Sequence, residues 1–132
     1  MSKVNDFLSQ TGSFFLATVD GDQPKLRPLG LHVEKDGRIL FGVGSFKDVF
    51  RQLLANPKCE IAALREDGHW LRYTGKAEFI DDPAVEEAVL DTAPYLRSIY
   101  NPETGNHLKV FFLADASAVE IATMGPGTDL LN

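Results

Sequence analysis

The stretch FGVGSFKDVFRQLLANP, residues 41–57, joins an apolar segment to an amphipathic one through a turn that contains two glycines. Gly42 and Gly44 permit backbone conformations that let a ligand approach the main chain closely. Ser45 follows, in a position to cap a helix that begins at about Lys47. Backbone N–H groups at a helix N-terminus, a capping hydroxyl and a lysine together favour a bound phosphate. The stretch therefore predicts a site for a phosphorylated small molecule.

A second cation, Arg27, lies upstream in a strand-like segment that a hairpin would bring alongside. It is flanked by apolar residues in the run LRPL (residues 26–29), where a bare surface arginine is unexpected. A guanidinium that faces a lysine is well suited to binding phosphate. The plain alternative is that Ser45 only caps the helix and that Lys47 and Arg51 are solvated.

Length and composition set the class of protein. The chain has 132 residues, 44% of them hydrophobic and 24% charged, which suits one globular domain over residues 1–132. The net charge of −6 argues against nucleic acid as a partner, although one local pocket can still be positive. There is no run of 18 apolar residues, and the N-terminal MSKVNDFLSQTG lacks the features of a secretory signal. We expect a cytoplasmic protein with no membrane partner.

Cysteine and histidine give little sign of metal or nucleophilic chemistry. The single cysteine, Cys59, lies in an apolar run and is expected to be a buried core thiol, which suits a reducing compartment. His32, His69 and His107 are spread along the chain without the spacing of metal ligands, so no metal site is predicted. No nucleophile motif is present, and we assign no catalytic residue.

Turn signals divide the chain into strands and helices. Six strands are predicted, over residues 14–19, 25–34, 38–43, 59–65, 70–80 and 108–122. Helices are predicted before Gly12, over residues 46–55, from Asp82-Pro83 and over residues 94–99. The last strand is expected to bend near residues 114–116, and the C-terminal MGPGTDLLN to fray. This order predicts a mainly β protein, a small closed barrel with helices, rather than a parallel sheet.

Trp70 and Arg72 lie two residues apart on a predicted strand, so their side chains share a face. An aromatic ring beside a cation makes a wall on which a planar ligand can stack. An exposed pair or a dimer contact explains the same pattern. The sequence leaves these alternatives open.

Three segments, taken in order, resemble the pyridoxamine 5′-phosphate oxidase-like family of FMN-binding split barrels. They are FFLATVDGDQPKLRPLG (14–30), RILFGVGSFKDVFRQLLANPKCEIAAL (38–64) and WLRYTGKAEFIDD (70–82). The most specific parts are the strand arginine, the S-x-K pattern followed by L-x-x-N-P, and the strand that ends in G-K-A-E. The resemblance covers roughly residues 12–82 and, more loosely, the rest. It implies a six-stranded split β-barrel of Greek-key type that forms a homodimer.

The resemblance also implies a binding site. In this family FMN binds at the homodimer interface, where the strand arginine and the S-x-K lysine hold its phosphate. Backbone around residues 28–31 would lie along the isoalloxazine ring, and the segment 70–72 would come from the partner subunit. The implied cofactor-binding residues are Arg27, Pro28, Leu29, Gly44, Ser45, Lys47, Trp70 and Arg72.

The sequence departs from the vitamin-forming members of this family, which narrows the reactions that the resemblance implies. The vitamin-forming oxidases have an arginine directly before the lysine, where this chain has Phe46, and a C-terminal Arg and His that the terminal GPGTDLLN does not supply. We therefore expect no pyridoxamine phosphate oxidation, and a closer likeness to the short flavin reductases, nitroimidazole-resistance-type reductases and small FMN-binding proteins. The expected function is FMN-dependent reduction or oxidation of a small molecule, with an electron donor such as NAD(P)H. The alternatives are a non-enzymatic electron-transfer protein and a split barrel that binds deazaflavin or haem.

Overall fold

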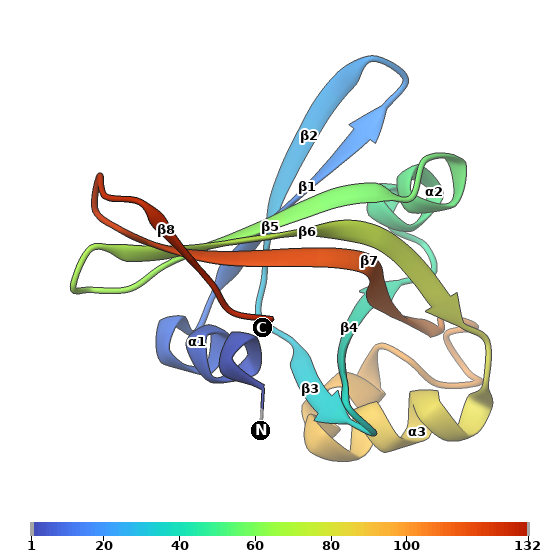
Figure 1. The fold of residues 1–132 in the computed structure, drawn as a ribbon. Coiled ribbons are helices and arrows are strands. Elements are labelled where there is room, and N and C mark those ends of the chain that lie inside the picture. Colours follow the sequence, from blue (N-terminus) through green and yellow to red (C-terminus); the bar gives the residue numbers. More distant parts are fainter. Residues whose placement is uncertain (1, 132) are drawn as a thin grey trace.

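A computed structural model of the chain describes residues 2–131. The strands are β1 (Phe14–Asp20), β2 (Gln23–Leu29), β3 (His32–Lys35), β4 (Arg38–Gly44), β5 (Lys58–Leu64), β6 (His69–Ile80), β7 (Leu108–Ala122) and β8 (Gly127–Asp129). The helices are α1 (Lys3–Thr11), α2 (Asp48–Ala55), α3 (Pro83–Thr92) and the 3₁₀ helix η1 (Pro94–Ser98). The strands form one antiparallel sheet in the order β2-β1-β5-β6-β7-β4-β3, and β8 pairs with β7 (Figure 1). The protein is therefore mainly β, as predicted.

The described residues form eight strands, so the predicted number of six is wrong. The segment 25–34 is two strands, because Gly30 and Leu31 turn the chain from one end of the sheet to the other. Three Cα steps join Leu29 to His32 and span at most roughly 11 Å, so these ends lie close and the sheet curls like a barrel. The C-terminal segment, expected to fray, supplies β8, which pairs with residues 119–121 of β7.

The predicted bend in the last long strand is confirmed. The β6–β7 register shifts between Thr74 and Lys76, opposite a stretch of β7 in which Asp115 has a positive φ of 51°. Gly75 lies at this bulge, where a Cβ would come within 2.9 Å of the Cβ of Leu113. The bulge changes the direction of the paired strands β6 and β7. As a result the first part of β7 pairs with β4, and residues 119–121 pair with β8.

Apolar side chains from the sheet and two helices make the main core. Residues Val4, Phe7 and Leu8 of α1 and Val49 and Leu53 of α2 are buried in it. The rings of Phe14, Phe41 and Phe111 form its centre, with successive centroids 5.7 and 5.6 Å apart. Fully burying one such side chain contributes about 1.5–3 kcal/mol. The core therefore fixes α2 against β1 and β4.

Two features of the core bear on earlier expectations. Gly12 ends α1 with a positive φ of 75°, as predicted, and Ser2 caps the helix by accepting from the N–H of Asn5. The predicted core thiol is also confirmed, because Cys59 is buried and its burial raises the pKa to about 11. A thiol with that pKa stays protonated at neutral pH and is inert.

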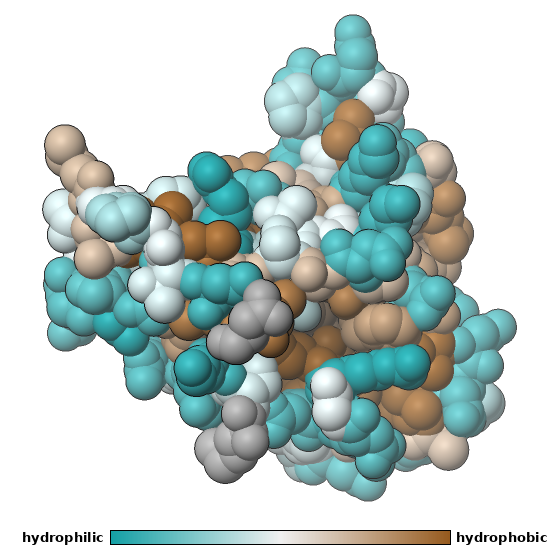
Figure 2. All heavy atoms as spheres, viewed as in Figure 1, coloured by the Kyte–Doolittle hydropathy of each residue, from teal (hydrophilic) through white to brown (hydrophobic). Residues whose placement is uncertain are grey.

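The surface carries exposed apolar side chains as well as charged ones. Figure 2 shows hydrophobic residues that reach the surface between hydrophilic ones on the face drawn there. Leu26 is 66% exposed and Leu64 is 68% exposed. None of the helices in the part described is long and apolar enough to cross a membrane.

Candidate functional site

A cavity of about 550 Å³ lies between β2, the end of β4 and the start of α2. Residues 25–29 of β2 form one wall, residues 42–44 of β4 a second, and Tyr100 contributes from the segment after η1. The structure brings five of the predicted site residues together on its lining: Arg27, Pro28, Leu29, Gly44 and Lys47. The hairpin and the helix that the sequence analysis placed side by side therefore do meet.

Arg27 is held at this cavity by a network of neutral acceptors. Its Nη1 donates to Thr18 Oγ1 at 2.8 Å and to the carbonyl oxygen of Leu16 at 3.1 Å. Its Nη2 donates to Gln52 Oε1 at 2.9 Å. Partial burial lowers the pKa of Arg27, but a guanidinium remains charged at any physiological pH. Arg27 thus presents a positive charge that no described carboxylate neutralises.

The other charges around the cavity add to this excess. Lys25 and Lys47 also line it, and neither forms an ion pair with a described residue. Two carboxylates line it too, Asp20 and Asp48, but Arg51 lies 3.5 Å from the first and 3.9 Å from the second. Their charge is therefore already partly compensated. The cavity lining therefore carries an excess of positive charge on an acidic protein.

The predicted cap of the helix is wrong. Helix α2 begins at Asp48 with Lys47 as its N-cap, and no side chain caps it. Ser45 lies outside the cavity lining, where its Oγ accepts from the N–H of His107 at 2.9 Å and its own N–H donates to the carbonyl oxygen of His107 at 2.8 Å. The reason is that Ser45 continues the pairing of β4 with β7 beyond Gly44. Its hydroxyl oxygen accepts a hydrogen bond at that strand end and does not cap α2.

The two glycines serve packing within the protein. A Cβ on Gly42 would come within 2.8 Å of the side chain of Leu108. A Cβ on Gly44 would meet the Phe46 ring at 2.9 Å and the Tyr100 hydroxyl at 3.0 Å. Side chains therefore pack against one side of each glycine, and both glycines also line the cavity.

Trp70 and Arg72 are not brought to the cavity within this chain. Both lie on β6, where the Arg72 guanidinium carbon is 4.9 Å from the centroid of the Trp70 ring. Arg72 Nε also pairs with Glu60 Oε1 at 3.1 Å. The cation and the ring do lie side by side, as expected, but neither residue lines the cavity within this chain.

Sequence reasoning missed Gln52 and Tyr100, which line the cavity, and Thr18, which does not line it but accepts a hydrogen bond from Arg27. Thr18 and Gln52 are 2% and 3% exposed, and Tyr100 lines the wall beside Gly44. A signal existed for Gln52, because it falls on the apolar face of α2 beside Val49 and Leu53, where a polar residue needs a partner. Nothing local distinguishes Thr18 from other strand threonines, or Tyr100 from other loop tyrosines.

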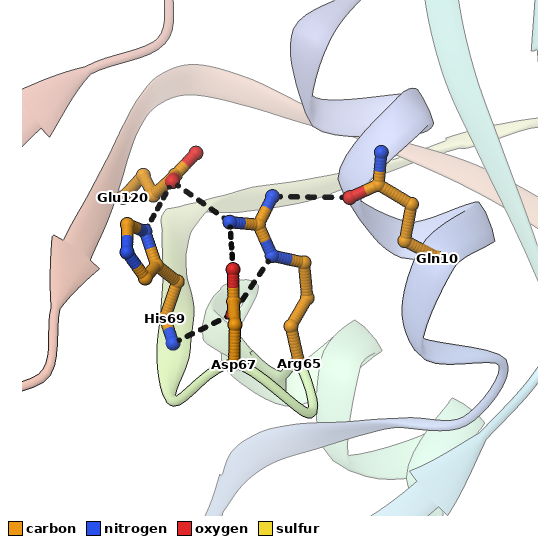
Figure 3. Close-up of polar contacts among 5 residues, drawn as sticks. All are labelled: Gln10, Arg65, Asp67, His69 and Glu120. Carbon is orange, nitrogen blue, oxygen red and sulfur yellow. Dashed lines mark hydrogen bonds and ion pairs between the residues drawn. The ribbon is translucent and has the colours of Figure 1, made fainter.

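The histidines lie outside the cavity lining. His32 Nδ1 is 2.7 Å from Asn5 Oδ1, and burial lowers its pKa. His107 Nδ1 is 3.6 Å from Glu86 Oε1. His69 belongs to a polar cluster at the β5–β6 turn, drawn in Figure 3. No group of His, Cys, Asp or Glu among residues 2–131 is arranged to hold a metal.

The cluster in Figure 3 ties the β5–β6 turn to α1 and β7. Arg65 Nη2 lies 2.8 Å from Asp67 Oδ2 and 3.3 Å from Glu120 Oε2, and its Nη1 donates to Gln10 Oε1 at 3.0 Å. His69 Nδ1 lies 2.7 Å from the same Glu120 oxygen. Each charge in this cluster has an opposite charge beside it, so its role is structural.

Comparison with known proteins gives a consistent result. A sequence model described as pyridoxamine 5′-phosphate oxidase matches residues 1–124. A NimC/NimA family protein from Clostridium acetobutylicum shares 30% identity and a TM-score of 0.88, over 97% of this chain and 89% of that one. A second protein of that organism, related to general stress protein 26, shares 13% identity and a TM-score of 0.75, over 97% and 92%.

A further structural neighbour is a protein that binds heme. It is a heme binding protein from Mycobacterium smegmatis, with 16% identity and a TM-score of 0.73 over 93% of this chain and 54% of that one. At this identity the likeness concerns the fold. No curated protein sequence matches the chain.

Proposed function

This chain belongs to the pyridoxamine 5′-phosphate oxidase family, and we propose that it binds FMN in the cavity between β2 and α2, with Arg27 and Lys47 holding the phosphate. The observation that carries the proposal is the charge of Arg27. It is partly buried, it lines the cavity, and its protein partners are all neutral. A cation placed in this way is best compensated by an anionic ligand.

The residues present fit a flavin mononucleotide. Ligand pockets typically measure roughly 300–1,000 Å³, and this cavity of about 550 Å³ falls within that range. Its cations gather where β2 faces the start of α2, while Pro28, Leu29 and Val43 give it an apolar side. A phosphate would fit the cationic region, and an aromatic ring would fit the apolar side.

A bound flavin would supply the electron-transfer chemistry, and the protein would supply binding, orientation and electrostatics. Arg27 and Lys47 would fix the phosphate by charge-assisted hydrogen bonds. Leu29 and Val43 would exclude water from one side of the ring. Among the described residues, the carboxylates that line the cavity are Asp20 and Asp48, and Arg51 pairs with both. We propose an oxidoreductase that acts on a small molecule, with an electron donor such as NAD(P)H.

The proposal includes a homodimer. Phe15 lies opposite Ala62 in the β1–β5 register, and Ala62 lies opposite Arg72 in the β5–β6 register. These residues, with Leu26 and Leu64, share one face of the sheet, on which the side chains of Phe15, Leu26 and Leu64 are exposed. A second copy on this face would remove that apolar surface from water.

The same face reaches the cavity. Pro28 lies opposite Phe15 on this face and also lines the cavity, so the two are continuous. A second copy seated there would bring its own strand β6 to the cavity mouth. Trp70 and Arg72 of the partner subunit are the residues that we propose reach the cofactor. This accounts for their position away from the cavity within one chain.

Haem is the second candidate, because one structural neighbour binds it. Haem iron is held in proteins by His, Cys, Met or Tyr. Among the described residues, the cavity lining contains no His, Cys or Met, and its one tyrosine is Tyr100. This composition favours a flavin over a haem.

The visible absorption spectrum of the purified protein, alone and after addition of FMN, tests the proposal. We expect flavin bands from the protein-bound fraction and quenching of FMN fluorescence on titration. A Soret band, or a deazaflavin spectrum without FMN binding, would instead establish one of the alternatives. Oxidation of NAD(P)H by the loaded protein with an added acceptor would separate an enzyme from an electron-transfer protein.

A further inference from the structure

Gln52 is an amide buried among apolar residues. It lies on the face of α2 that carries Val49 and Leu53 into the core, and it is 3% exposed. A buried amide costs free energy unless its polar atoms find partners. Its presence on this face therefore has to be explained by what its polar atoms do.

The amide oxygen closes a ring of hydrogen bonds around Arg27. Gln52 Oε1 accepts from Thr18 Oγ1 at 2.6 Å and from Arg27 Nη2 at 2.9 Å. Thr18 Oγ1 in turn accepts from Arg27 Nη1 at 2.8 Å. The guanidinium is a donor only, so the Gln52 atom that faces it has to be the oxygen. Both terminal nitrogens of Arg27 are thereby fixed in position.

The chemical nature of residue 52 decides the charge of the site. A glutamate has nearly the same shape as glutamine and would accept the same two hydrogen bonds. It would also place a negative charge beside the guanidinium and form a buried ion pair, which cancels the charge that an anion would meet. The amide holds Arg27 equally well and leaves its charge in place.

The amide has a donor to offer as well. Its oxygen makes both of its hydrogen bonds, and its nitrogen has no hydrogen-bond acceptor among the residues described. Gln52 lines the cavity together with Arg27 and Lys47. Gln52 can therefore act on an anion in two ways. Its amide N–H can donate to the anion directly, and its amide oxygen holds the Arg27 guanidinium that attracts it.

We propose that Gln52 is the residue that makes this cavity specific for a phosphorylated ligand, because its neutral amide positions Arg27 without neutralising it. The inference rests on the proposed function, since the ligand concerned is the phosphate of FMN. It assigns Gln52 and Thr18 as positioning residues that act through Arg27. The predicted consequence is selectivity for FMN over riboflavin, which has the same ring and no phosphate.

The test compares the affinities of FMN and riboflavin for the wild-type protein and for Gln52→Glu, each measured by quenching of flavin fluorescence. We expect FMN to bind Gln52→Glu at least about tenfold more weakly, and riboflavin to bind within about twofold of wild type. Gln23→Glu is the matched control. It adds the same charge on β2 at an exposed position that bonds only to the Pro24 carbonyl oxygen, and it should leave both affinities unchanged.

Two results would overturn the inference. One is wild-type FMN affinity in Gln52→Glu. The other is an equal loss for FMN and riboflavin, which would mean that Gln52 only anchors α2 to β1. If Gln52→Glu does not fold, Thr18→Val replaces it. That change removes one anchor of Arg27 without adding charge, and it should weaken FMN a few-fold while leaving riboflavin binding unchanged. An unchanged FMN-to-riboflavin ratio in Thr18→Val would contradict the positioning role.

A failure of the proposed function would look different. If wild-type protein binds neither flavin, the FMN proposal is wrong, and inorganic phosphate then tests the inference by itself. Phosphate should raise the melting temperature of the wild type and not that of Gln52→Glu. An equal response of the two proteins to phosphate would overturn the inference.

Discussion

Arg27 and Arg65 each hold together a cluster of polar side chains, and the two clusters differ in charge. Arg65 lies against the carboxylates of Asp67 and Glu120, and the hydrogen bond to Asp67 raises its pKa. Arg27 lies against a hydroxyl, a carbonyl and an amide, and burial lowers its pKa. The first cluster is complete without a ligand, whereas the second has a positive charge left to compensate.

The comparison shows how to separate a structural arginine from a binding one. Hydrogen bonds alone do not distinguish them, since both guanidinium groups make several good ones. What differs is whether a carboxylate is among the acceptors, since both arginines line a cavity. Arg72, which pairs with Glu60 on the sheet face, lies between the two cases. Each prediction below tests one part of this distinction.

The largest effect is expected at Lys47, the other cation of the site. Lys47→Ala removes an unpaired charge from the cavity wall and should weaken FMN binding about tenfold to a hundredfold, since a charge-assisted contact is worth about 1.5–3 kcal/mol. Lys76 is the control, because it is exposed and near Asp115, at 4.0 Å, away from the cavity. Equal FMN dissociation constants for Lys47→Ala and Lys76→Ala would remove Lys47 from the site.

Arg72 should have an intermediate effect. Its charge is shared with Glu60, and it reaches the flavin only from the partner subunit, so Arg72→Ala should weaken FMN binding a few-fold. A cation near the ring also favours the reduced, anionic flavin, so the midpoint potential should fall in the variant. The measurement is a redox titration of protein shown by light scattering to be a dimer. Wild-type affinity together with a wild-type potential would leave Arg72 as a surface residue.

Arg65 should have no effect on FMN affinity. Arg65→Ala leaves Asp67 and Glu120 without their cation and should lower the melting temperature at neutral pH. FMN affinity should stay at the wild-type value because the cluster lies outside the cavity lining. A loss of FMN affinity without a change in melting temperature would reverse the roles assigned to the two clusters.

The smallest expected effect is the pH dependence of the Arg65 cluster. The hydrogen bond from Arg65 holds the pKa of Asp67 below its ordinary value of 3.8. The stabilisation is therefore present above that value and is lost as the pH falls through the lower pKa of the folded state. The melting temperature of Asp67→Asn should be below that of wild type at pH 7, and the gap should close below about pH 4. A gap that is constant with pH would show that the Asp67 charge contributes nothing.

The sequence predicted the positions of most strands better than it predicted how the strands are connected and paired. The hydrophobic pattern located the strands that end as β1, β4, β5, β6 and β7, because alternation and turn residues are local signals. The pattern predicted β2 and β3 as one strand. The break at Gly30 and Leu31 exists because β2 and β3 lie at opposite ends of the strand order, which is not a local signal. The pattern missed β8 because the residues 127–129 become a strand only by pairing with β7.

The site was predicted in the same uneven way. Arg27 was found from charge in an apolar context and Lys47 from its place at the start of a helix, and the structure brings both to one cavity. Ser45 was assigned to a helix cap because the S-x-K spacing fits one, but the strand partner His107 is 62 residues away in the sequence. The role of Gln52 depends on Thr18, 34 residues away, and on Arg27, 25 residues away. Contacts of that range leave no local pattern.

The central claim is that the uncompensated charge of Arg27 binds the phosphate of the cofactor. The most direct measurement is the ratio of the dissociation constants of riboflavin and FMN in the wild type and in Arg27→Ala. The account predicts that the wild type prefers FMN and that the ratio falls at least about tenfold in the variant, through loss of FMN affinity. An unchanged ratio in Arg27→Ala would contradict it.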